Sequence, residues 1–211
     1  MNNSKATEVI MLCKGANRIL NNLDEAFKYQ LKKYNAECGS GFYTIRDEDL
    51  AEKYARAFTS TGQIPIVNYY KFELQRMKRD CIRQAYFNDL SFNSLDYVGR
   101  NLSGIFPSSC KYNRDPNISP KDKCYECDNE LCEWSSPYIE AFLSENVDFC
   151  FDDILKSFIV KDISEEEAVS KINKILIEHK SPLRIQIVIR SDLKDYIHYS
   201  HYRALAPKEA E

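Results

Sequence analysis

Cysteines gather in one short stretch of this chain, the segment CYECDNELCEW at residues 124–134. Cys124, Cys127 and Cys132 have the spacing C-x2-C-x4-C. A C-x2-C turn lets two thiolates bind one ion, and tetrahedral zinc in a structural site takes four protein ligands. Cys110 precedes the cluster across a loop of thirteen residues and is the natural fourth ligand. The spacing predicts a structural zinc site on these four cysteines.

The segment before the cluster gives a physical reason for a metal. The loop PSSCKYNRDPNISPKDK at 107–123 is rich in Pro, Asn and charge and has little apolar material to bury. A metal would hold it, because metal-binding free energy becomes folding free energy. Core thiols or a redox centre remain alternatives, since the spacing matches no ferredoxin pattern and lacks a zinc ribbon's second C-x2-C. Cys150 and His179 are rival fourth ligands.

A second candidate is the outer side of a helix expected at 66–88. Its three arginines fall within about 60° on a helical wheel, and a phenylalanine extends the stripe at either end. Basic residues interleaved with aromatic ones suit a phosphate backbone and stacked bases. Against this, segment 140–167 holds nine acids and two lysines and offers salt-bridge partners within the chain. The predicted nucleic-acid-binding residues are Arg76, Arg79, Arg83, Phe72 and Phe87.

A third candidate is SDLKDYIHYSHYR at 191–203, which directly follows the best strand pattern of the chain. Asp192, Asp195, His198 and His201 recur at every third residue. Ligands and acid–base groups often lie at the C-terminal ends of strands in α/β folds. In an α-helix, however, successive members would be rotated by about 60°, so the four cannot share one face. They form only an alternative catalytic or metal-binding group.

Composition and motifs exclude several classes of function. The net charge of -3 gives no polyanion-binding signature, and the mean hydropathy of -0.50 suits a folded protein outside a membrane. The chain shows no Walker A, dinucleotide-binding, zinc-protease or nucleophile-elbow motif. The apolar run near the start covers only residues 9–13, too short for a signal peptide or membrane span. A reducing cytoplasmic or nuclear compartment is therefore expected, with the eight cysteines unpaired.

Helical periodicity dominates the first half of the sequence. Apolar residues recur three or four apart from 5 to 35, and again in a helix that begins near Thr44 or Asp47. Pro65 suits the first turn of the third helix. The sequence predicts an N-terminal bundle of these helices.

The last third has mixed signals. Ser164 and Glu167 have capping-box spacing and predict a helix over 164–179. LRIQIVIRS at 183–191 has the alternation of a strand, while the tail after it reads as one more helix. SSPYIEAFLSE at 135–145 also predicts a helix, opened by its proline.

These patterns predict a mostly α (α+β) protein in three regions. They are a helical region at 1–106, a Cys-rich zinc-binding loop at 107–133 and a small C-terminal α/β region at 134–211. As an alternative, the three regions form one continuous domain. The expected function is that of a non-enzymatic, zinc-stabilised binding or regulatory factor with a protein partner, with nucleic acid as a further ligand and no membrane. A metal-dependent hydrolase or nuclease using the 192–201 group and a purely protein-binding adaptor are the alternatives.

Overall fold

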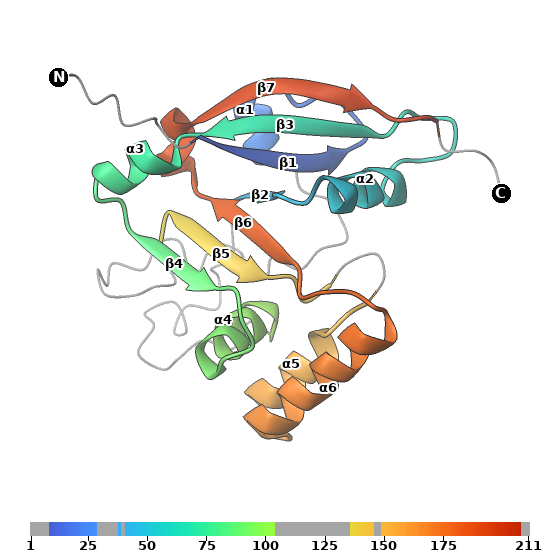
Figure 1. The fold of residues 1–211 in the computed structure, drawn as a ribbon, viewed down its shortest axis with the longest axis vertical. Coiled ribbons are helices and arrows are strands. Elements are labelled where there is room, and N and C mark those ends of the chain that lie inside the picture. Colours follow the sequence, from blue (N-terminus) through green and yellow to red (C-terminus); the bar gives the residue numbers. More distant parts are fainter. Residues whose placement is uncertain (1–8, 29–37, 39–40, 104–135, 146–148, 208–211) are drawn as a thin grey trace, which may run out of the picture.

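One mixed sheet organises the molecule (Figure 1). The computed structural model describes residues 9–28, 38, 41–103, 136–145 and 149–207. Within them, seven strands follow the order β4-β5-β6-β2-β1-β3-β7. The strands are β1 (Ile10–Ala16), β2 (Phe42–Ile45), β3 (Ile66–Phe72), β4 (Gln84–Phe87), β5 (Tyr138–Phe142), β6 (Ile185–Ile189) and β7 (Ile197–Ala204).

Strands that precede the cysteine-rich segment in the sequence are interleaved in this sheet with strands that follow it. β6 pairs with β2 and β5, and β7 pairs with β3. Neighbouring strands are antiparallel except β4 and β5, which are parallel. The regions predicted at 1–106 and 134–211 therefore build one sheet together.

Helices cover both faces of the sheet. They are α1 (Leu23–Lys28), α2 (Glu48–Ala57), α3 (Leu74–Arg79), α4 (Phe92–Ser103), α5 (Asp152–Ile159) and α6 (Glu165–Glu178), with a 3-10 helix, η3 (Ser191–Tyr196). One face packs against α4, α5 and α6 in one half of the sheet and against α2 in the other. The opposite face packs against α1, α3 and η3.

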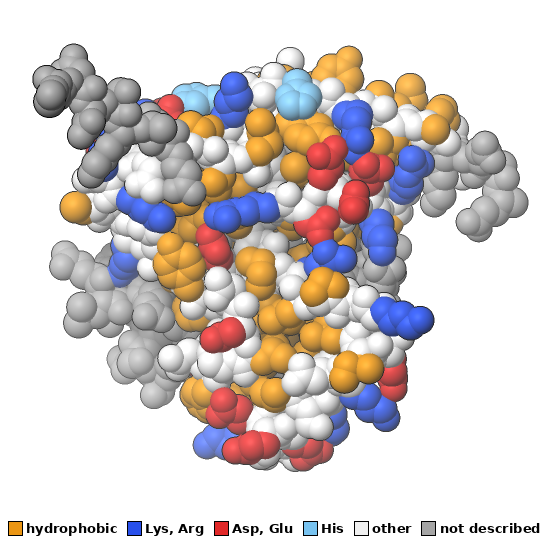
Figure 2. Space-filling view, in the orientation of Figure 1, with side chains coloured by type: hydrophobic (Ala, Val, Ile, Leu, Met, Phe, Trp, Pro, Cys, Tyr) orange, Lys and Arg blue, Asp and Glu red, His pale blue; other side chains and the backbone are white. Residues whose placement is uncertain are grey.

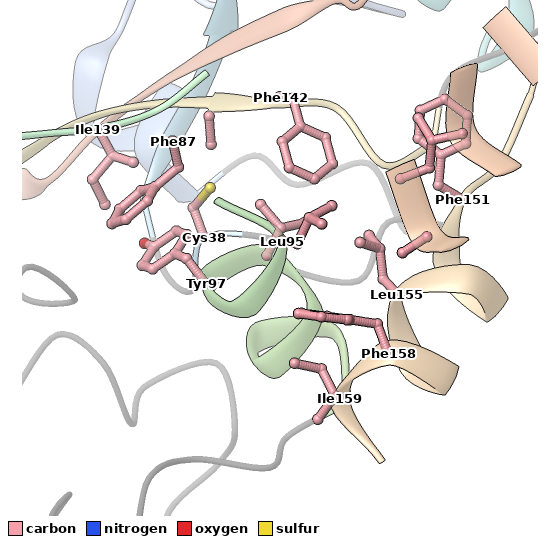
Figure 3. Close-up of a cluster of buried hydrophobic side chains, with 14 of the residues drawn as sticks. Cys38, Phe87, Leu95, Tyr97, Ile139, Phe142, Phe151, Leu155, Phe158 and Ile159 are labelled. Atoms are coloured by element: carbon pink, nitrogen blue, oxygen red, sulfur yellow. The ribbon is translucent and has the colours of Figure 1, made fainter. Parts of the chain in front are cut away.

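The largest hydrophobic cluster lies between β4–β6 and the helices α4–α6. Figure 3 shows Leu95 of α4 lying below Phe142 of β5, while Phe158 and Ile159 of α5 extend toward α4. The rings of Phe87 and Tyr97 stack with centroids 3.8 Å apart. Burial of several aromatic rings here supplies much of the apolar area that stabilises the fold.

The prediction of a mostly α protein with an N-terminal helical bundle is wrong. The fold is mixed α/β, with 41% of the described residues in helix and 27% in strand. β1 lies in the first half of the helix predicted at 5–35, of which α1 is the described helical part. The helix predicted at 66–88 is the succession of β3, α3 and β4. The helices predicted at 135–145 and in the tail correspond to strands β5 and β7.

Burial on both faces explains the errors at β1, β3 and β5. Six of the seven residues of β3 are buried, because helices cover the sheet on each side. A strand buried on both faces reads as a continuous apolar run and loses the alternation that identifies a strand. Its apolar residues then continue into α3 with spacings that imitate one long helix.

Candidate functional site

The predicted zinc ligands lie outside the described residues. These are Cys110, Cys124, Cys127 and Cys132, together with the whole predicted loop at 107–133. Of their rivals, His179 ends α6 and lies 6.0 Å from the Phe149 ring centroid. Zinc at the four cysteines stays a prediction.

The second rival, Cys150, belongs to a different group of potential ligands. Its thiol and the carboxylates of Glu145 and Asp152 offer ligand atoms that all lie within 4.8 Å of one another. An isolated β-bridge between Glu145 and Cys150 sets this geometry, and Ser144 Oγ donates to Asp152 Oδ1 at 2.7 Å. Burial raises the pKa of the Cys150 thiol to about 11, so a metal would have to displace its proton.

The basic and aromatic stripe predicted for nucleic acid is not formed, because its residues lie on β3, on α3, on β4 and, for Arg83, in the connection between α3 and β4, instead of on one helix. Phe72 is fully buried and Phe87 is 3% exposed, in two separate clusters, so neither ring presents a face to a base. Arg79 is exposed in the last turn of α3, and Arg76 forms ion pairs with two nearby acids. Nucleic-acid contact by the arginines stays a prediction.

The four residues of the alternative catalytic group are divided between two elements. Asp192 and Asp195 lie on η3, and His198 and His201 lie on β7. They form no metal-binding group: within the described part of the chain, the 145–152 cluster is the one set of three or more such side chains close enough to share an ion. The tail is an extended strand where a helix was predicted.

A β-bulge brings the two histidines of β7 onto one face. Tyr70 of β3 pairs with Tyr199, and the next residue back, Tyr69, pairs with His201, which leaves Ser200 as the extra residue. Without the bulge, residues three apart on a strand would point to opposite faces. His198 and His201 instead lie on the same face, beside Lys71 and Tyr69 respectively.

We call Lys71, His198, His201 and Arg203 the β7 surface. All four are exposed, and all four lie on the same face of the β3–β7 pair. Figure 2 shows two histidines with Lys and Arg side chains beside them along the edge where Figure 1 places β7, and acidic side chains gathered below, over α2. Among the described residues, Lys71 has no ion-pair partner.

Glu73 fixes one end of the β7 surface. Its carboxylate contacts His198 Nε2 at 2.8 Å and accepts a hydrogen bond from Arg76 Nη1 at 3.1 Å. The hydrogen bond from His198 is the main cause that lowers the Glu73 pKa. Arg76 also lies over the Tyr196 ring, and the Tyr196 hydroxyl donates to Asp80 at 2.6 Å. This network ties the start of β7 to α3.

Tyr69 and α2 fix the other end. The His201 ring stacks on Tyr69 with centroids 4.3 Å apart and an interplanar angle of 5°. The Tyr69 hydroxyl donates to Glu48 Oε1 at 2.6 Å, and burial together with this acceptor raises the Tyr69 pKa. Arg203 bonds the same Glu48 oxygen at 2.9 Å and also pairs with Glu52. Three side chains of the β7 surface, those of His198, His201 and Arg203, are thus held in place by residues far away in the sequence.

Sequence reasoning found the two histidines but missed their partners. Glu73, Glu48 and Tyr69 become partners only through the pairing of β3 with β7 and the packing of α2. No local spacing carries this information, because the paired residues lie more than a hundred positions apart in the chain.

Comparison of the chain with known proteins found no matching family model, no matching curated protein and no matching solved structure. None of the helices in the described ranges has the length and apolar character needed to span a bilayer.

Proposed function

We propose that this protein is a non-enzymatic binding or regulatory factor that contacts a protein partner through β7. The observation that carries the proposal is the position of β7 at the end of the strand order, where its outer edge pairs with no other strand of the described chain. An edge strand presents unpaired N–H and C=O groups along one side. An extended segment of a partner can add to such an edge as a further strand.

Length and shape favour β7 over the opposite edge of the sheet. β7 has eight residues, whereas the other edge strand, β4, has four. Natural proteins commonly shorten edge strands to prevent pairing with other chains. β7 is long, pairs with β3 along its length, and is also joined to Glu73 at one end and to α2 at the other.

The charge of the β7 surface favours an acidic partner segment. The β7 surface offers one lysine, one arginine and two histidines, and Tyr202 on the opposite side of the strand is 47% exposed. Glu73, Glu48 and Glu52 form ion pairs with the histidine and arginine side chains of this surface and neutralise part of its charge. Lys71 has no ion-pair partner among the described residues. Alternate acidic side chains of an added strand would lie next to these cations.

Selection from a displayed library of random peptides on the immobilised protein tests this proposal. We expect the enriched peptides to be acidic and free of proline, and to slow hydrogen exchange of the amides at 197–204 when bound. Lys71→Glu combined with His201→Glu should weaken their binding at least about tenfold, because repulsion replaces attraction. Lys174→Glu on α6 is the matched control and should leave the affinity unchanged.

Enriched peptides that protect other amides, or no enrichment, would reject β7 as the binding edge. A dimer that protects β7 without any peptide would show that the occupant is a second copy of the chain. Light scattering of the purified protein separates that outcome from peptide binding.

A further inference from the structure

A cleft of about 310 Å³ lies where β2, β5 and β6 meet the start of α2. Two arginines and two acids line it, and its other walls are leucine, isoleucine and proline side chains. The charged lining residues are Arg46, Asp47, Glu140 and Arg184. None of these residues belongs to the β7 surface, so the cleft requires its own explanation.

Both acids of the cleft are already engaged. Glu140 Oε1 accepts hydrogen bonds from the Tyr138 hydroxyl at 2.6 Å and from Arg46 Nη2 at 3.1 Å. Asp47 caps α2 by accepting from Leu50 N at 3.0 Å, and its second oxygen pairs with Arg184 Nη1. The carboxylates therefore neutralise the two guanidinium groups and have little capacity for a cationic ligand.

The arginines, in contrast, have donors to spare. A guanidinium carries five N–H donors. To described residues, Arg46 donates only through Nη2 and Arg184 only through Nη1. Arg184 Nε is buried and has no hydrogen-bond partner within the described chain. This Nε has almost no accessible surface, so an acceptor in the cleft would instead reach the exposed parts of the guanidinium groups, whose side chains are 50% (Arg46) and 28% (Arg184) exposed.

We propose that this cleft binds a small carboxylate with an aliphatic body. The carboxylate oxygens accept from the spare donors of Arg46 and Arg184, since planar guanidinium groups match carboxylate geometry. The aliphatic part lies against Leu50 and Ile187, where leaving water is favourable. Apolar walls with a few convergent polar groups, in a volume of this size, are typical of small-molecule sites. A free aliphatic acid and the C-terminal residue of a peptide share this chemistry.

Titration of the isotope-labelled protein with hexanoate, followed by two-dimensional NMR, tests the proposal. Hexanoate should shift the amide signals of residues 183–187 in a saturable way. Hexan-1-ol tests the need for the charge, acetate tests the need for the aliphatic body, and hexylamine tests the sign of the charge. Each of the three should bind at least about tenfold more weakly than hexanoate.

Arg46→Gln should weaken hexanoate binding at least about tenfold, because it removes charge-assisted donors and keeps the shape. Arg56 is an exposed arginine in the last turn of α2. Arg56→Gln is the control and should bind hexanoate like the unchanged protein. Urea unfolding of both variants checks that the fold is kept. Equal binding of hexan-1-ol, or hexanoate shifts that do not saturate or that Arg46→Gln leaves unchanged, would overturn the proposal.

Competition between hexanoate and a leucine-terminated peptide separates the two sources of carboxylate. A peptide with a free C-terminus that displaces hexanoate, when its amidated form does not, assigns the cleft to a chain terminus. Hexanoate binding that neither peptide affects assigns it to a free aliphatic acid.

Discussion

A lysine amine enclosed in the sheet makes stability depend on pH. Lys14 of β1 is 7% exposed, donates from Nζ to the carbonyl of Tyr43 at 2.9 Å and lies 5.0 Å from the centre of the Phe42 ring. Burial disfavours the charged form and lowers the Lys14 pKa from 10.5 to about 7. The unfolded chain therefore binds a proton over a pH range in which the folded protein does not.

The free energy of unfolding should rise with pH between 7 and 8.5, by as much as about 1.4 kcal/mol per pH unit from this group. The sign follows because the unfolded state binds more protons than the folded state in this range. Lys14→Met fills the same space without a charge and should flatten the slope. Urea unfolding at pH 7, 7.75 and 8.5 measures both slopes.

Lys174→Met, on the exposed side of α6, is the control and should keep the original slope. Parallel slopes for Lys14→Met and the unchanged protein would contradict the assignment. The range stays below pH 9 because burial raises the pKa of Cys13 to about 11, and that thiol acts in the opposite direction above its ordinary value of 9.0.

At the scale of elements, the packing of α2 on β1 depends on one glycine. A Cβ added to Gly15 would lie 2.3 Å from the Ala51 carbonyl oxygen and 2.6 Å from the Ala55 nitrogen. Both are helix backbone atoms, which cannot rotate away as a side chain can. Gly15 thus sets how closely α2 approaches the sheet and holds Glu48 and Glu52 near β7.

Gly15→Ala should lower the free energy of unfolding by about 3 kcal/mol or more, because overpacked cores relax only by moving backbone. Gly62→Ala is the matched comparison: its φ of 79° favours glycine, but no atom lies within 4 Å of the added Cβ. It should cost about 1 kcal/mol. Thermal and urea unfolding rank the two variants, and an equal loss in both would show that contact with α2 does not limit this position.

Elements with local signals were predictable, and those defined by long-range burial were not. α2 begins directly after Asp47, one of the two predicted starts, and Ser164 caps α6 as predicted by accepting a hydrogen bond from Glu167. β6 lies within the strand predicted at 183–191. β1 and β3 were missed because they are buried on both faces and so lack the alternation of apolar and polar residues that identifies a strand. β7 was missed because it is mostly exposed and lacks the same alternation. The histidines of the candidate site were visible in the sequence, but the bulge that aligns them was not.

At the scale of the whole molecule, the predicted zinc segment separates two groups of strands in the sequence, and these strands are interleaved in one sheet. β1 to β4 precede it and β5 to β7 follow it. A structural ion there would shorten a long connection between paired strands and stabilise the fold through the unfolded state as well.

Elemental analysis of freshly purified protein should find about one zinc ion per chain. Cys127→Ser should lose the zinc and much of the stability, because a missing thiolate opens the site. Cys81→Ser, an exposed cysteine of the described chain, should keep both. Zinc lost from Cys150→Ser but kept in Cys127→Ser would move the site to the group with Glu145 and Asp152.

The strand order also dictates when this chain can fold during synthesis. β6 lies between β5 and β2 in the sheet, and it leaves the ribosome after both of them. Until β6 emerges, β2 and β5 each present an open edge. The pair β4–β5 and the group β2–β1–β3 then have no strand to join them. Pairing over such sequence distances is slow, and unpaired edges invite aggregation. A nascent chain stopped before residue 185 is therefore a natural client for chaperones that bind extended, apolar segments.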